Sequence, residues 1–321
     1  MYAAYWNLRA IPFLNVVDSR YFFTGDQHEE AVARFTFLAE SGRLAGVLTG
    51  PYGAGKSTVL KRIADAIQGQ NIPVVCMDAI PGGQLPMAKH ILEAMQIEDA
   101  STSLPDALMS FWRAANAQPN KLVRTLLCID EAHYLAADNG LYLAHYLTNL
   151  RITNPKTQTE EPLFTVIMAG APELVPALQA EPSLCQRIQI TFNLSPLSEE
   201  QTTGYVQHHM RAVGGDIWIF DSAALSAIYR YSGGLPRKIN LLCDTGLMLG
   251  FAAQVPHVNA AIIHQAACDT GLTTLHTHPA AQSPAPQAPA AQPSAPPQAP
   301  VATPAQDAPT RIPLPNIPPR A

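Results

Sequence analysis

The sequence predicts an α/β fold, in which helices cover a buried parallel sheet, and a smaller helical domain after it. Short β-branched apolar runs alternate with amphipathic helical stretches in the first part of the chain. This alternation is typical of parallel strands joined by crossover helices. Strand patterns end at Leu194, and helical patterns continue alone. From about residue 279 the composition changes to Pro, Ala and Gln, which cannot bury enough apolar surface to fold.

The predicted elements follow in order along the chain. Asp26 and Glu29 mark a helix start, after which Ala31, Phe35 and Leu38 fall on one helical face. Near-continuous apolar runs predict strands that are covered on both faces, at residues 46–49, 74–78, 125–130 and 164–169. Further helices are predicted over residues 58–67, 198–213, 221–232, 237–251 and 259–269.

Size and charge restrict the class of protein. With 321 residues, of which 47% are hydrophobic, the folded part can bury the core of one large domain or two modest ones. The net charge is −5, and lysines and arginines are not clustered. This argues against strong non-specific attraction to nucleic acid, although it leaves room for a local DNA-binding patch.

Cysteine spacing and the apolar segments bear on the compartment. The five cysteines form no C-x-x-C pair, so neither a zinc site nor a disulfide framework is expected. The first ten residues lack the basic and apolar regions of a signal peptide. The longest apolar segment, residues 241–255, is interrupted by Asp244 and is too short to cross a bilayer comfortably. We therefore expect a cytoplasmic protein without a transmembrane segment.

A phosphate-binding loop is predicted between the first strand and the next helix. The segment matches G-x-x-x-x-G-K-[ST] in full and consists of Gly50, Pro51, Tyr52, Gly53, Ala54, Gly55, Lys56 and Ser57, followed by Thr58. Its backbone N–H groups and the helix N-terminus supply positive potential to a phosphate. Lys56 would reach the β- and γ-phosphates, and Ser57 would ligate Mg²⁺.

Two adjacent acids end the strand at residues 125–130. The carboxyl ends of parallel strands lie beside the phosphate loop, so Asp130 would hold Mg²⁺ and Glu131 could polarise the attacking water. These residues predict an ATPase rather than only a nucleotide binder. The letters Asp-Glu-Ala-His also spell the box of one helicase group, but the chain lacks room for a second motor domain. We therefore expect His133 to be a packing or hydrogen-bonding residue.

Several motifs together resemble a known family. These are Tyr5-Trp6-x-Leu8-x-x-x-Pro12-Phe13, Gly170-x-Pro172-Glu173-Leu174, Ser195-Pro196-Leu197-Ser198 and Gly234-Leu235-Pro236-Arg237-Lys238-Ile239-Asn240. With the phosphate loop, they resemble AAA+ ATPases of the ExeA/GspA type (general secretion pathway protein A), related to the MuB and TniB transposition ATPases. The resemblance covers roughly residues 1–270. It implies binding of ATP, since no N-K-x-D guanine signature is present.

The resemblance implies roles for two arginines. Arg237 looks like the lid arginine that senses the γ-phosphate, and a guanidinium can bind phosphate oxygens in a fork. Arg187 lies where AAA+ proteins place an arginine finger that reaches a neighbouring subunit's nucleotide, and Arg151 is an alternative. One departure concerns Ala171, where the family usually has a polar residue. An alanine cannot orient water by hydrogen bonding, so hydrolysis is slow or another group substitutes.

Four parts are expected. These are an N-terminal aromatic segment (1–26), an AAA+ nucleotide-binding α/β domain (27–194), a helical lid (195–272) and a disordered Pro/Ala/Gln-rich tail (273–321). The aromatic segment is expected to pack on the nucleotide domain's surface or at the adenine edge, with an exposed protein-binding patch as the alternative. The tail's last residues, 311–320, form either a docking peptide or an inert end.

Three functions are consistent with these features. The favoured one is an ATPase that assembles into a homo-oligomer with ATP, disassembles on hydrolysis, and remodels a protein partner at the cell envelope or elsewhere. The second is a transposition-type regulator that forms an ATP-driven filament on DNA, against which the low basic charge argues. The third is a nucleotide-gated interaction protein with little turnover, which Ala171 favours.

Overall fold

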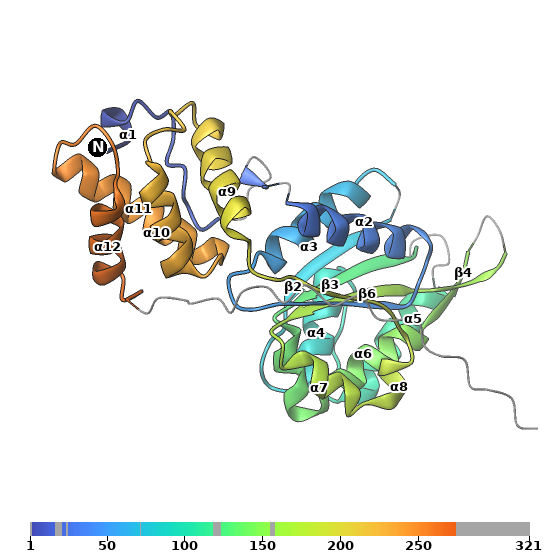
Figure 1. Ribbon diagram of the computed structural model, residues 1–321. Coiled ribbons are helices and arrows are strands. Elements are labelled where there is room, and N and C mark those ends of the chain that lie inside the picture. Colours follow the sequence, from blue (N-terminus) through green and yellow to red (C-terminus); the bar gives the residue numbers. More distant parts are fainter. Residues whose placement is uncertain are drawn as a thin grey trace, which may run out of the picture. The chain divides into compact units, whose positions relative to one another are not determined.

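The computed structural model describes residues 2–16, 21–23, 25–70, 72–117, 123–154 and 158–273 (Figure 1). The Pro/Ala/Gln-rich tail lies outside the described residues from 274 onward, so its disorder stays a prediction. Within the described parts no helix is both long and apolar enough to cross a membrane.

A five-stranded parallel sheet carries the site, with the strand order β2-β3-β6-β1-β7. Its strands are β1 (Ala45–Thr49), β2 (Val74–Asp78), β3 (Thr125–Asp130), β6 (Phe164–Gly170) and β7 (Ile188–Asn193). The three central strands are fully buried, which explains their continuous apolar runs. The predicted sheet is confirmed, with two differences that both concern its edges.

The two edge strands depart from the prediction. The sequence predicts that strand β2 is covered on both faces, but two of its residues are only partly buried and two are exposed, because it has a neighbouring strand on one side alone. The sequence reasoning missed β7 altogether. Its residues alternate between partly buried Ile188, Ile190 and Phe192 and their exposed neighbours, which is the period-two signal of a half-covered strand.

Helices cover both faces of this sheet (Figure 1). On one face α2 (Asp26–Glu40) and α3 (Lys56–Ile67) bury an apolar cluster, in which Ala31, Phe35 and Leu38 are fully buried as predicted. The other face is covered by α4 (Gln84–Ala94), α5 (Leu104–Ala117) and α6 (Gly140–Asn149). Shorter elements complete this part of the chain: η2 (Ala132–Asn139), β4 (Arg151–Thr153), β5 (Glu160–Pro162), α7 (Leu174–Gln179) and α8 (Pro182–Cys185).

The predicted helical lid is present and begins where the strand signal ends. Its helices are α9 (Glu199–Ala212), α10 (Ser222–Ser232), α11 (Pro236–Ala252) and α12 (Ala260–Asp269), each within about two residues of the predicted bounds. Three of them begin at side-chain caps, which satisfy N–H groups that the first turn leaves unpaired. The caps are Ser198, Asp221 and Asn259.

The N-terminal segment packs into the lid core, which corrects the expectation that it lies on the nucleotide domain's surface. After α1 (Tyr2–Tyr5), the side chains of Trp6, Leu8 and Phe13 are buried in the cluster formed by the lid helices. The indole N–H of Trp6 donates to the Leu247 carbonyl at 2.9 Å. The lid core thus needs apolar side chains from the start of the chain, a long-range pairing that no local pattern encodes.

Candidate functional site

The predicted phosphate loop lies between β1 and α3. Gly53 and Gly55 have φ angles of +81° and +100°, which glycine adopts at no steric cost. A Cβ at Gly53 would also come within 2.8 Å of the Arg237 Cβ, so the lid packs directly against the loop backbone. The glycines therefore shape the loop and let the lid approach it.

Lys56 lies inside the curve of this loop. Its side chain is buried, and its ammonium donates hydrogen bonds to the carbonyls of Gly50 at 2.9 Å and Pro51 at 3.1 Å. Burial lowers its pKa from the ordinary value, and the nearby carboxylates of Glu131 and Asp130 oppose this shift. A cation held by two neutral carbonyls can exchange them for the oxygens of a phosphate, which are stronger acceptors.

Ser57 and Asp130 meet where β3 ends beside the loop. The Ser57 hydroxyl donates a hydrogen bond to Asp130 Oδ2, while Asp130 Oδ1 accepts from the Glu131 N–H at 2.8 Å. A hydroxyl beside a carboxylate is an oxygen pair of the kind that Mg²⁺ takes in nucleotide sites, where phosphates and waters fill the remaining positions. The described residues contain no group of three or more His, Cys, Asp or Glu side chains that could hold a metal alone.

Glu131 follows Asp130 with a φ of +49°, in the left-handed region that a side chain rarely adopts. Its carboxylate lies 3.3 Å from His133 Nδ1 and is partly exposed. His133 Nε2 in turn lies 3.1 Å from the Tyr52 hydroxyl. The expectation that His133 makes hydrogen bonds is thereby confirmed.

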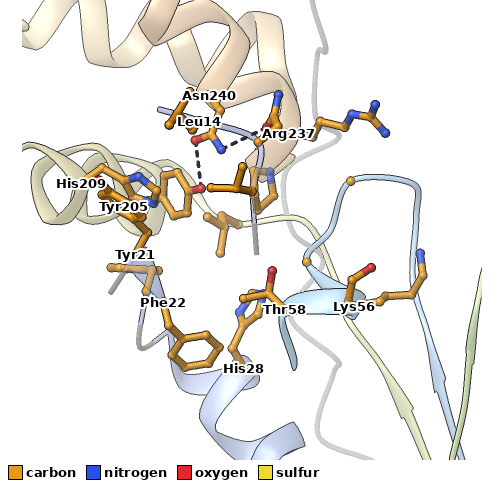
Figure 2. Close-up of a pocket in the computed structure, with 18 of the residues that line it drawn as sticks. Leu14, Tyr21, Phe22, His28, Lys56, Thr58, Tyr205, His209, Arg237 and Asn240 are labelled. Carbon is orange, nitrogen blue, oxygen red and sulfur yellow. Dashed lines mark hydrogen bonds between the residues drawn. The ribbon is translucent and has the colours of Figure 1, made fainter. Parts of the chain in front are cut away.

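A cavity of about 350 Å³ opens beside the loop and is lined on one side by Gly53, Gly55, Lys56, Ser57 and Thr58. This volume is in the range of small-ligand pockets. Opposite walls come from the N-terminal segment and from the lid (Figure 2). The members that sequence reasoning missed are Leu14, Asn15, Val16, His28, Leu197, Tyr205, His209 and Asn240. Three residues of the aromatic segment, Tyr21, Phe22 and Phe23, also line this cavity, while the predicted adenine edge stays a prediction.

Hydrogen bonds between distant segments hold the second wall in place. The Tyr205 hydroxyl donates to Asn240 Oδ1 at 2.9 Å, and Asn240 Nδ2 donates to Asn15 Oδ1 at 3.2 Å (Figure 2). His28 is buried below the loop, with its Nε2 3.2 Å from the Ala54 carbonyl. Asn240 belongs to one of the quoted motifs, but no local pattern indicates that Tyr205, Asn15 or His28 lies at this cavity, because tertiary packing alone brings them there.

The structure brings one of the three predicted arginines to the loop. Arg237 lines the cavity, follows Pro236 at the start of α11, and donates its backbone N–H to the Gly53 carbonyl at 3.3 Å. Arg187, between α8 and β7, is not among the cavity-lining residues, and its Nε has no hydrogen-bond partner in the described parts. Arg151 donates to the carbonyls of Thr148 and Leu150, at 2.8 and 3.3 Å.

Comparisons with known proteins agree with this geometry. A family model described as an AAA domain matches residues 39–178. General secretion pathway protein A of Aeromonas hydrophila is 30% identical over 259 residues, which are 78% of this chain and 45% of that protein. The chain thus spans less than half the length of this relative.

Two solved structures share the fold at low identity. The ORC2 protein of Aeropyrum pernix has a TM-score of 0.60 at 12% identity, over 81% of this chain and 71% of that one. The RuvB Holliday junction branch migration motor of Thermotoga maritima has a TM-score of 0.52 at 16% identity, over 80% of this chain and 73% of that one. At such identities the likeness concerns the fold alone.

Proposed function

Since the chain belongs to the AAA+ ATPases and carries an AAA domain over residues 39–178, we propose that it binds Mg-ATP in the cavity and hydrolyses it. One observation carries the proposal. Ser57 of the phosphate loop and Asp130 at the end of β3 are within hydrogen-bond contact, with Glu131 next to them. This contact joins a triphosphate cradle to the two acids that hydrolysis needs.

Each side chain has a distinct role in this proposal. The backbone N–H groups of the loop and the ammonium of Lys56 bind the phosphates, while Ser57 and Asp130 hold Mg²⁺. When bound, the metal would supply charge stabilisation at the transferred phosphoryl oxygens. Glu131 polarises the attacking water, and Arg237 binds the γ-phosphate from the lid.

The aromatic and apolar wall of the cavity supports an assignment for the base. Tyr21, Phe22 and Leu197 provide apolar surface near the loop, and Thr58 lies at the start of α3. A planar base gains free energy by leaving water for such a wall, while the triphosphate occupies the loop. We assign this wall to adenine.

Nucleotide binding would be coupled to assembly. The Gly53 carbonyl accepts a hydrogen bond from the Arg237 backbone, so a change in the loop on phosphate binding acts on the start of α11. Arg187, away from its own cavity, would act as an arginine finger on the nucleotide of a second copy in a homo-oligomer. Hydrolysis would then depend on assembly.

The similarity to general secretion pathway protein A supports a protein partner at the cell envelope. ATP-dependent DNA binding is the second candidate and is less well supported, because the net charge is −5. Retention on DNA at physiological salt, only with ATP, would favour the second candidate.

Two variants test the site. Lys56→Ala removes the phosphate-binding cation and should weaken ATP binding at least about a hundredfold by calorimetry. Glu131→Gln keeps the shape of the side chain but loses the base, so it should bind ATP normally and release almost no phosphate. Lys61→Ala is the control, because Lys61 is an exposed residue of the same helix that pairs with Asp65 at 2.9 Å.

The outcomes separate the possibilities. Wild-type affinity in Lys56→Ala would reject the loop assignment, and unchanged turnover in Glu131→Gln would reject its role as base. Normal ATP binding by the wild type with no measurable hydrolysis would instead indicate a nucleotide-gated interaction protein, for which the buried, apolar Ala171 is the supporting feature.

A further inference from the structure

We propose that His133 is a positioning residue that holds the Glu131 carboxylate in place and ties it to the phosphate loop through Tyr52. The inference rests on the proposed function, since it concerns the carboxylate assigned to activate water. It is carried by the contacts around the imidazole ring, which touches the base, the loop and the end of β6.

The Glu131 carboxylate has little else to orient it. Its backbone is held in the left-handed region at φ +49°, and its Oε2 is buried without a hydrogen-bond partner among the described residues. The nearest ionisable partner in the described parts is His133, whose Nδ1 lies 3.3 Å from Oε2. A base acts well only at a fixed distance from its proton, so a neighbour that fixes this carboxylate affects the rate.

The imidazole ring is itself fixed from several sides. It meets the Tyr52 ring edge-on at 5.7 Å and lies against the Tyr134 ring at 4.3 Å. Gly170 allows the close approach, since a Cβ there would come within 3.1 Å of the His133 backbone N. The side chain is 10% exposed, which leaves the ring little freedom to rotate.

The contacts around the ring are compatible with either tautomer of a neutral imidazole. Nδ1 faces two groups, the Glu131 carboxylate at 3.3 Å and the Ala171 N–H at 3.4 Å. The Ala171 N–H donates to Nδ1 when the ring hydrogen is on Nε2. The proposal concerns the other tautomer, in which Nδ1 carries the hydrogen and faces the carboxylate as a donor. In that tautomer Nε2 is an acceptor for the Tyr52 hydroxyl, which lies 3.1 Å away.

The contact between Tyr52 and His133 connects the base to the phosphate loop, because Tyr52 belongs to that loop. The Lys56 ammonium lies 5.6 Å from the centre of the Tyr52 ring, so occupation of the loop by phosphate acts on both residues. Ala171, which follows β6, has only a methyl group as its side chain, so apart from its backbone N–H it offers no hydrogen-bonding group here. His133 is therefore the polar side chain that links the loop to the base in this corner.

The test compares variants of the full chain by phosphate release and by calorimetry with Mg-ATP. His133→Ala should lower kcat about tenfold or more and leave the Kd for ATP within about twofold, because the ring does not line the cavity. His133→Asn should recover part of kcat, since its amide can donate to the carboxylate. Tyr52→Phe should lower kcat less than His133→Ala does, because it removes only the hydroxyl next to Nε2 and keeps the imidazole beside the carboxylate.

Tyr134→Phe is the matched control. It keeps the ring that packs on His133 and removes a hydroxyl that takes no part in the contacts joining Glu131, His133 and Tyr52. Equal kcat in wild type and His133→Ala would overturn the proposal, as would an equal loss of kcat in His133→Asn and His133→Ala. If circular dichroism shows that His133→Ala is unfolded, the kcat values of Tyr52→Phe and Tyr134→Phe are compared in its place. Equal kcat in those two variants would overturn the proposal. Absence of ATP binding by the wild type would reject the proposed function itself.

Discussion

His209 is buried in the lid, and replacing it should change how the stability of the protein depends on pH. Its ring lies between Phe13 and Tyr21, with centroids 5.5 and 5.4 Å away, and its Nδ1 lies 2.8 Å from the Pro12 carbonyl. The carbonyl can only accept, so Nδ1 carries the hydrogen of a neutral ring. Burial lowers the pKa of His209 from about 6.5 to about 4; the hydrogen bond to the Pro12 carbonyl opposes this shift, and His208 adds a smaller contribution in the direction of burial.

The sign and size of the effect follow from this shift. In the unfolded chain the residue takes up a proton below about pH 6.5, while the folded protein resists protonation until about pH 4. The contribution of His209 to the free energy of unfolding is thus fully present above about pH 6.5 and is lost as the pH falls toward about 4. A shift of about 2.5 pH units at 1.36 kcal/mol per unit gives about 3 kcal/mol in full, of which about 2 kcal/mol is lost by pH 5.

Urea unfolding at pH 7.5 and pH 5 measures this term. His209→Phe keeps an aromatic ring in the stack and removes the titrating group. Between pH 7.5 and pH 5 its free energy of unfolding should therefore fall by about 2 kcal/mol less than that of the wild type. Other buried groups, including His28, also have a pKa lowered by burial, but they contribute equally in both proteins. His257→Phe, at an exposed lid position, is the control and should behave as the wild type does. The reasoning is refuted if wild type and His209→Phe lose the same stability.

Two further predictions concern the arginines. Arg237→Ala should lower kcat/KM for ATP about tenfold or more in a phosphate-release assay, because a charge-assisted contact to the γ-phosphate is lost, while Arg230→Ala on the neighbouring helix should have no effect. Unaltered kcat/KM in Arg237→Ala would remove it from the site. If Arg187 acts on the nucleotide of another subunit, mixing Arg187→Ala protein with Lys56→Ala protein should restore some hydrolysis, whereas co-assembly without recovery would contradict the finger.

The adjacency of the phosphate loop and the two acids could be predicted from the sequence, because each part is a local pattern. Lys56 and Ser57 stand at fixed spacings in one loop, and Asp130 ends a strand whose apolar run is unmistakable. Adjacency of loop and acid then follows from parallel strands that share one edge. The missed strand β7 shows the limit, since Ile188–Asn193 reads as alternating polar and apolar residues after a short helix. Its place beside β1 depends on tertiary pairing, which a local pattern does not specify.

The other wall of the cavity could not be predicted, and the reason lies in how the lid is built. The segment with Trp6 and Phe13 packs into the lid core, which places Asn15 within hydrogen-bond distance of Asn240. Sequence reasoning identified the aromatic residues but assigned them to the nucleotide domain, because apolar side chains do not indicate which core they enter. The wall that we assign to the base comes from three distant segments, so it forms only after the lid has folded around the N-terminus.

This arrangement gives nucleotide binding a direct mechanical consequence. The Gly53 carbonyl accepts the Arg237 N–H, and the space a Cβ would need at Gly53 is already filled by the Arg237 side chain. The loop backbone therefore cannot close around a phosphate without acting on the first turn of α11. That helix also carries Asn240, which holds the N-terminal segment through Asn15. The phosphates would thus act on α11 through Arg237, and the base would act on the same helix through Asn240. A nucleotide that favours one position of the lid over another through such contacts couples its binding to the position of the lid.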